Sequence, residues 1–244
     1  SMLAILILAF TAVNPNFLSA FNLYNFWMQN EYRIVMIIGL SFIVLGGEID
    51  LSLGYQISLV GVLMGKMFSL GVPTYICLAS GLLTGILCGL LNGSLVAVVG
   101  IPSFIVTLIT QKLFQGLSYL ISGGMMYSDI PDSILGISSL NNGMFTSSHI
   151  VVIISLLIFG GIFSSTVAGK NILAMGYDER VLAQNGIGVK RYKCMIYVIG
   201  SILFFFASLI LLSRQGLAVS NMGVGMELDG LFAVCIAGGG GLLI

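Results

Sequence analysis

The chain has 244 residues, of which 58% are apolar and only 7% are charged. Soluble domains carry about 25% charged residues, so this composition excludes a soluble globular protein. Nine basic residues balance nine acidic ones, and so few cations at zero net charge exclude a nucleic-acid partner.

Apolar runs follow one another along the whole chain, and most approach the roughly 20 residues that a helix needs to cross a membrane. Backbone polar groups in lipid must be bonded within their own segment, so continuous runs predict helices rather than strands. We therefore predict an all-α polytopic membrane protein, with residues 1–244 forming one domain of about eight transmembrane helices. The runs lie near residues 2–13, 32–47, 53–71, 74–99, 101–122, 149–168, 194–213 and 226–244.

The first interruption inside the apolar sequence is the segment 46–54, which holds glycines and two carboxylates. Its polar residues are Glu48, Asp50 and Ser52, and they follow Gly47. Asp50 or Ser52 is expected to cap the next helix by accepting its free N–H groups. The alternative is a pathway or coupling site, because ionisable residues and broken helices at membrane depth mark such sites. No histidine or nucleophile accompanies the carboxylates, so catalysis is not expected here.

The fourth run contains glycines at four-residue spacing, Gly81, Gly85 and Gly89. Small residues on one helix face let two helices approach closely, so this pattern predicts tight packing of the bundle.

The fifth run begins at Pro102, a residue tolerated in the first turn of a helix. Thr107, Gln111 and Gln115, together with Thr110 or Ser118, then fall on one stripe of that helix. This stripe predicts either hydrogen bonds between helices or the polar lining of a translocation path. With Asn92, the residues Thr107, Gln111 and Gln115 are the candidate path residues.

Charge is concentrated in one loop near residues 170–193, which holds five of the nine basic residues. The positive-inside rule places this loop in the cytoplasm. Counting spans from it puts residues 123–148 outside, residues 46–52 and 100–103 inside, residues 14–31 and 214–225 outside, and the N-terminus in the cytoplasm.

The same loop is long enough for one or two short helices, with apolar residues spaced between its charges. A short amphipathic helix that docks on a partner or lies at the membrane surface fits this pattern. A solvated connector is the alternative.

The second interruption precedes the last run, where Glu227 and Asp229 follow Gly223 and Gly225. Negative charge is favoured at a helix N-terminus, so a capping role is the simplest interpretation.

Two kinds of site are not expected from the sequence. The four cysteines share no metal-ligand spacing, and they are interpreted as packed free thiols rather than disulfides or zinc ligands. The chain contains no phosphate-binding motif, so ATP hydrolysis would require another subunit.

The segments 47–54, 91–93 and 101–108 resemble the permease subunit of bacterial ABC importers of the ribose/monosaccharide type, in a family that includes branched-chain amino-acid permeases. In this sequence they are Gly-Glu-Ile-Asp-Leu-Ser-Leu-Gly, Leu-Asn-Gly and Ile-Pro-Ser-Phe-Ile-Val-Thr-Leu. Residues 174–187 are similar to the family's cytoplasmic coupling loop, and residues 225–239 to its Gly-Tyr-Glu-Leu-Asp and Gly-Gly segment. The resemblance covers nearly the whole chain.

The departures from the family pattern are local. Glu48 stands where the family usually has its second glycine, and Val181-Leu182 replace the usual Ala-Ala of the coupling loop. The family also continues beyond the position of Gly241, so about two further spans, up to ten in all, are expected in the full protein.

The resemblance implies an importer of two permeases and two ATPase subunits, fed by an extracytoplasmic binding protein that delivers a sugar or sugar-like solute. ATP and Mg²⁺ would bind the ATPase, and this chain would hold no cofactor or metal. The loop 169–193 would couple the two subunits through residues Gly176, Asp178, Glu179, Arg180, Gly186 and Ile187.

Two other classes of function are weighed against the importer. An ion-coupled transporter or channel would use Glu48, Asp50, Glu227 and Asp229 as proton or cation sites. An intramembrane enzyme is disfavoured because the sequence offers one histidine, no metal-ligand spacing and no nucleophile motif.

Overall fold

The computed structural model describes residues 2–14, 16–139 and 146–237, and most of them lie in helices. These ranges contain no β-strand, and an isolated antiparallel bridge joins Tyr127 to Ala218. The prediction of an all-α polytopic membrane protein is confirmed. In chain order the helices are α1 (Met2–Val13), α2 (Ala20–Leu45), α3 (Leu53–Ser69), α4 (Thr74–Ser94) with a π-helical continuation (Leu95–Val99), α5 (Ser103–Ser122), α6 (Asp132–Leu135), α7 (Ser147–Ser165), α8 (Val167–Tyr177), α9 (Glu179–Gln184), α10 (Val189–Gln215) and α11 (Met226–Ala237).

Five of the described helices are long and apolar enough to span a membrane: α2, α4 with its continuation, α5, α7 and α10. The helices in the other three predicted runs are shorter, with 12 residues in α1, 17 in α3 and 12 in α11. At 1.5 Å per residue α3 is about 25 Å long, less than the roughly 30 Å hydrocarbon core. The end of the last predicted run, residues 238–244, lies outside the described residues.

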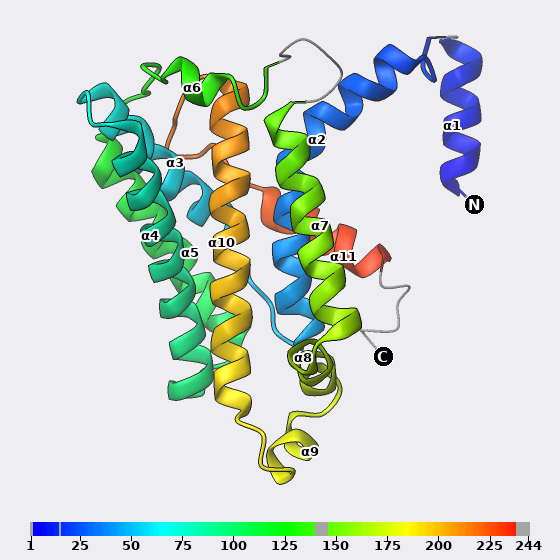
Figure 1. The fold of residues 1–244 in the computed structure, drawn as a ribbon, viewed down its shortest axis with the longest axis vertical. Coiled ribbons are helices and arrows are strands. Elements are labelled where there is room, and N and C mark those ends of the chain that lie inside the picture. Colours follow the sequence, from blue (N-terminus) through cyan, green and yellow to red (C-terminus); the bar gives the residue numbers. More distant parts are fainter. Residues whose placement is uncertain (1, 15, 140–145, 238–244) are drawn as a thin grey trace.

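The long helix α10 runs the height of the bundle and packs mainly against α2 and α4 (Figure 1). The short helix α3 is enclosed by α4, α5 and α10, and most of its residues are buried. In Figure 1, α11 lies at mid-height of the bundle, while α8 and α9 lie at one end and α6 at the other. We call these two ends the loop end and the α6 end.

The glycine stripe of α4 packs directly on α10, as predicted. A Cβ atom on Gly85 would lie 3.1 Å from the Ser201 carbonyl oxygen, and one on Gly89 would lie 2.7 Å from the Tyr197 carbonyl oxygen. Gly81 faces the side chains of Met64 and Phe205 at similar distances. Larger residues would separate the two helices at this contact.

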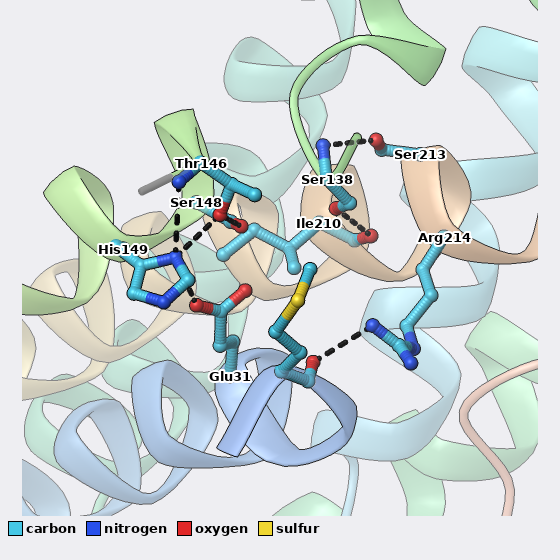
Figure 2. A network of polar contacts seen from close by, with 9 residues as sticks. Glu31, Ser138, Thr146, Ser148, His149, Ile210, Ser213 and Arg214 are labelled. Atoms are coloured by element: carbon cyan, nitrogen blue, oxygen red, sulfur yellow. Dashed lines mark hydrogen bonds and ion pairs between the residues drawn. The ribbon is translucent and has the colours of Figure 1, made fainter. Parts of the chain in front are cut away.

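The prediction that the second run begins near residue 32 is wrong, because α2 begins at Ala20. Polar residues misled the prediction, yet the helix satisfies them: the Asn30 side-chain amide, for example, donates to the Phe26 carbonyl at 2.7 Å. Glu31 is fully buried, and its Oε1 lies 2.9 Å from His149 Nδ1 (Figure 2). The polar end of α2 is therefore packed against the N-terminus of α7.

Two of the connecting segments lie at opposite ends of the bundle, as the predicted parity requires of them. Residues 100–103 line a cavity together with α9, at the loop end. The segment leading into α6 lies at the opposite end (Figure 1). Which end faces the cytoplasm stays a prediction from charge.

Candidate functional site

The two glycine-flanked interruptions lie against each other inside the bundle. A Cβ atom on Gly54 would lie 2.4 Å from the Gly223 carbonyl oxygen, and one on Gly223 would lie 2.3 Å from the Gly54 carbonyl oxygen. The Gly223 N–H also donates to the Ser58 hydroxyl at 2.9 Å. The start of α3 thus touches the segment that leads into α11, a contact that only residues without side chains allow.

The first interruption holds a fully buried carboxylate, Asp50. Its Oδ1 accepts the N–H and the hydroxyl of Ser52 at 2.7 and 2.6 Å, and its Oδ2 accepts from Gln56 Nε2 at 3.1 Å. Asn92 Nδ2 donates to the Ser52 hydroxyl at 2.8 Å, and the Ser201 hydroxyl donates to Gln56 Oε1 at 2.8 Å. We call these five residues the Asp50 cluster. Burial of a polar group is tolerated when it is hydrogen-bonded, and here neutral donors supply the bonds.

The predicted capping of α3 by Asp50 or Ser52 is wrong. Ser52 stands at the N-cap position, but its side chain makes no capping hydrogen bond. Asp50 accepts from Ser52 itself rather than from the first turn of the helix. Both side chains are instead used inside the buried cluster, which joins α3 to α4 and α10.

The second interruption brings Glu227 to the polar stripe of α5. Gln111 Nε2 donates to Glu227 Oε1 at 3.3 Å, across 116 positions of sequence. Glu227 is 8% exposed, and its Oε2 has no hydrogen-bond partner among the described residues. A Cβ atom on Gly54 would lie 2.5 Å from this oxygen, so the carboxylate rests against the start of α3.

The rest of the stripe is divided between the bundle interior and its surface. Thr107 and Thr110 are buried, and their hydroxyls donate to carbonyls one turn earlier in α5. Ser118 is also buried. Gln115 is only partly buried and accepts from Lys112 Nζ at 3.3 Å, so it does not join the Gln111–Glu227 pair.

The two acidic residues of α11 point to different partners. Asp229 lies 3.7 Å from Arg33 of α2, and both side chains are substantially exposed. An exposed ion pair adds little stability. Of the two carboxylates, Glu227 therefore belongs to the interior site, whereas Asp229 lies on its outer side.

The 169–193 loop forms two short helices, α8 and α9, at the loop end. Asp178 caps α9, because its Oδ1 accepts the backbone N–H groups of Arg180 and Val181 at 2.8 and 3.3 Å. Leu182 is buried, while Tyr177 and Val181 are 84% and 53% exposed. Within the described part of the chain, the loop thus exposes two large apolar side chains, Tyr177 and Val181.

The loop is held against the first interruption by backbone contact. A Cβ atom on Gly176 would lie 2.2 Å from the Leu45 carbonyl oxygen, and one on Gly47 would lie 3.1 Å from Gly176 Cα. Gly47 also has φ of 81°, a conformation that favours glycine. The end of α2 and the end of α8 therefore meet at two glycines.

Side chains strengthen the same contact. Lys193 Nζ lies 2.7 Å from Glu48 Oε1 and 2.5 Å from Glu179 Oε2. The Tyr197 hydroxyl donates to the Ile49 carbonyl at 3.0 Å. Both Lys193 and Tyr197 belong to α10, so this helix ties the interruption to the loop.

Two of the predicted coupling residues lie away from this contact. Gly186 has φ of 76° and open space around it, and Ile187 is partly buried against the hydrophobic core. Sequence reasoning missed Gln56, Ser201 and Lys193 as site residues. Lys193 was counted only as a topology signal, and no local pattern joins it to Glu48.

The described geometry offers buried hydrogen-bonding groups and an ionic contact between the loop and the first interruption. Within the described ranges, no three His, Cys, Asp or Glu residues gather to hold a metal ion. Cys77 and Cys88 are buried free thiols, and Cys194 and Cys235 are partly buried ones.

This chain has two helix breaks that meet inside its bundle, and such breaks are a recurrent feature of membrane transporters. Comparison with known proteins gives its family: residues 22–243 match the model of the branched-chain amino acid transport system permease component. The chain belongs to this family and is a permease component of an ABC importer.

Two relatives illustrate the similarity. The ribose import permease protein RbsC of Haemophilus influenzae is 30% identical over 240 residues, which cover 97% of this chain and 74% of the relative. The autoinducer 2 import system permease protein LsrD of Escherichia coli strain SMS-3-5 is 30% identical over 245 residues, covering 98% and 74%. No solved structure matches the chain. The comparisons support the importer interpretation over the ion-coupled transporter.

Proposed function

We propose that this chain moves a sugar or sugar-like solute across the bacterial cell membrane as one of two permease subunits of an ATP-driven importer. Its partners would be ATPase subunits, a second permease copy or paralogue, an extracytoplasmic binding protein and the surrounding lipid. ATP and Mg²⁺ would bind the ATPase, and this chain would contribute no cofactor. The N-terminus and the 169–193 loop would lie on the cytoplasmic side, and residues 1–244 would act as one permease domain.

The observation that carries this proposal is an unbroken series of contacts from the loop to the middle of the bundle. Gly176 touches the end of α2 beside Gly47, and the same segment continues into the Asp50 cluster. The start of α3 then touches Gly223 and the carboxylate of Glu227, which pairs with Gln111. A partner that moves the loop would therefore move backbone segments that reach the polar interior.

The interior of this series suits a hydroxyl-rich solute. The amides of Asn92 and Gln111, the hydroxyl of Thr107 and the carboxylate of Glu227 are groups that bond sugar hydroxyls. Two relatives are named as permeases for ribose and for autoinducer 2, which supports this class of solute. We assign these four residues to the translocation path. The closed packing around them implies that the path opens only when the broken helices shift.

The exposed face of α9 is the proposed ATPase-docking surface, and it supplies the first test. A Val181→Glu substitution places a charge on its apolar part, and an unpaired charge buried in an interface costs several kcal/mol. We expect ATPase binding to weaken by about tenfold or more. Copurification of the ATPase subunit with the detergent-purified permease measures this effect.

The control for this test is Ser133→Glu, which adds the same charge at an exposed residue of α6, at the other end of the bundle. We expect it to bind the ATPase as the unmodified chain does. Undiminished ATPase binding by the Val181→Glu permease would contradict the assignment of this surface.

A further inference from the structure

The lysine that joins the loop to the first interruption is placed to transmit motion between them. Lys193 lies on α10, but both of its anionic partners lie elsewhere: Glu48 in the interruption after α2 and Glu179 in the first turn of α9. Lys193 is thus bonded both to a residue of the proposed docking helix α9 and to a residue of the first interruption.

The two partners differ in their surroundings. The side chain of Glu48 is 9% exposed and that of Lys193 is 17% exposed, whereas Glu179 is 53% exposed. Ion pairs in partly buried positions are screened much less by salt than exposed ones, and charge-assisted hydrogen bonds are the stronger kind. Salt therefore screens the inner bond to Glu48 less than the outer bond to Glu179, and the outer bond reaches the face that a partner would move.

Two cavities adjoin the lysine and its partners. One of about 620 Å³ is lined by Glu48, Glu179, Lys193 and residues 100–103 at the start of α5. Another of about 500 Å³ is lined by the same three residues with Gly47 and Gly176. The ionic link therefore borders open volume, which leaves these charges room to move together.

The glycine contact alone transmits only compression. Backbone atoms of Gly47 and Gly176 touch without a hydrogen bond between them among the described residues. Movement of the loop toward the interruption would push through this contact, but movement away would separate the two surfaces. A two-way transmission needs an attractive link, and Lys193 supplies one at hydrogen-bonding distance to both sides.

We propose that Lys193 is a coupling residue that makes the first interruption follow the docking helix α9 in both directions, through its simultaneous bonds to Glu179 and Glu48. This inference rests on the proposed function, because it takes the ATPase to be what moves α9.

The test measures whether the interruption and α9 move together in the complete permease–ATPase complex in lipid nanodiscs. Spin labels at Ile49 and Gln184, both exposed, report the distance between the two elements with and without vanadate-trapped MgATP. In the permease that keeps Lys193, and in the Lys193→Arg variant, we expect the mean distance between the two labels to change by less than about 2 Å when MgATP is trapped. For Lys193→Met, which keeps the length but removes the charge, we expect a change of several Å.

Lys190→Met is the matched control, because Lys190 lines the same 620 Å³ cavity but forms no ion pair within the described part of the chain. It is expected to behave as the unmodified chain does. An unchanged distance in Lys193→Met, or an equal change in all four proteins, would overturn the proposal. So would loss of ATPase binding by Lys193→Met alone, because the lysine would then serve docking rather than transmission.

A second variant keeps the proposal testable if Lys193→Met does not fold. Glu48→Met removes the inner bond, because methionine offers no oxygen acceptor, while leaving Lys193 paired with Glu179; it is expected to give the same uncoupled distance. If it keeps the distance fixed, the inner bond does not transmit motion. Failure of the unmodified permease to bind any ATPase would instead count against the proposed function.

Discussion

A Gly176→Ala variant is expected to lose ATP-driven transport by about tenfold or more, although it adds a single methyl group. The added Cβ atom would lie 2.2 Å from the Leu45 carbonyl oxygen and 3.2 Å from the Gly47 nitrogen. Both neighbours are backbone atoms, so α8 must move away from the end of α2. That movement would separate the proposed coupling loop from the first interruption and leave its remaining contact, through Lys193, misplaced.

The matched control is Gly188→Ala, in the same loop. Gly188 has φ of −73°, and a Cβ atom there would meet nothing within 4 Å. We expect the Gly188→Ala variant to keep its transport rate within about twofold of that of the unmodified chain. Solute uptake by proteoliposomes that contain the full importer measures both variants. Equal activity of Gly176→Ala and Gly188→Ala would show that the glycine contact is not needed for coupling.

An Asp50→Ala variant is expected to have the largest effect on stability. It removes the acceptor of three hydrogen bonds, two from Ser52 and one from Gln56, inside a fully buried cluster. Donors left unsatisfied in such a site cost about 1–3 kcal/mol each, so we expect a loss on the order of 3 kcal/mol or more. For a chain of this size that loss corresponds to a fall in Tm of roughly 6–12 °C.

Thermal unfolding of the detergent-purified permease measures this change. Asp50→Asn keeps one carbonyl acceptor and the same shape, so its Tm should fall by less than that of Asp50→Ala. Asp132→Ala, which removes an exposed carboxylate from the first turn of α6, is the control and should leave Tm nearly unchanged. A Tm of Asp50→Ala equal to that of the control would contradict the role of the Asp50 cluster in holding α3, α4 and α10 together.

The sequence alone was sufficient for the helical class and for the position of the interruptions, because both depend on local composition. Apolar runs marked the helices, and glycines beside carboxylates marked the breaks at residues 46–54 and 223–229. The stripe of Gly81, Gly85 and Gly89 likewise predicted a close helix contact, which α10 provides. The positions at which helices start are less predictable from sequence. Glu31 is a polar residue that local composition places outside an apolar run, yet it lies inside α2. Its partner there is His149, 118 positions later in the chain.

The pairings inside the site lay beyond sequence reasoning because they join distant segments. Gln111 and Glu227 were each singled out for a different reason, and nothing in their spacing predicts that they meet. Lys193 satisfies the positive-inside pattern equally well with or without a bond to Glu48. Ser52 illustrates the opposite error, since its type and position suggest a helix cap, whereas three-dimensional packing assigns its hydroxyl to Asp50.

Uptake by reconstituted proteoliposomes tests the central claim most directly, with the full permease, its ATPase and its binding protein present and labelled D-ribose as the first probe of the sugar class. The account predicts uptake that requires ATP on the ATPase side, persists without any ion gradient and is lost when the ATPase is omitted. Uptake by the permease alone, driven by a proton or sodium gradient in the absence of ATP, would contradict it.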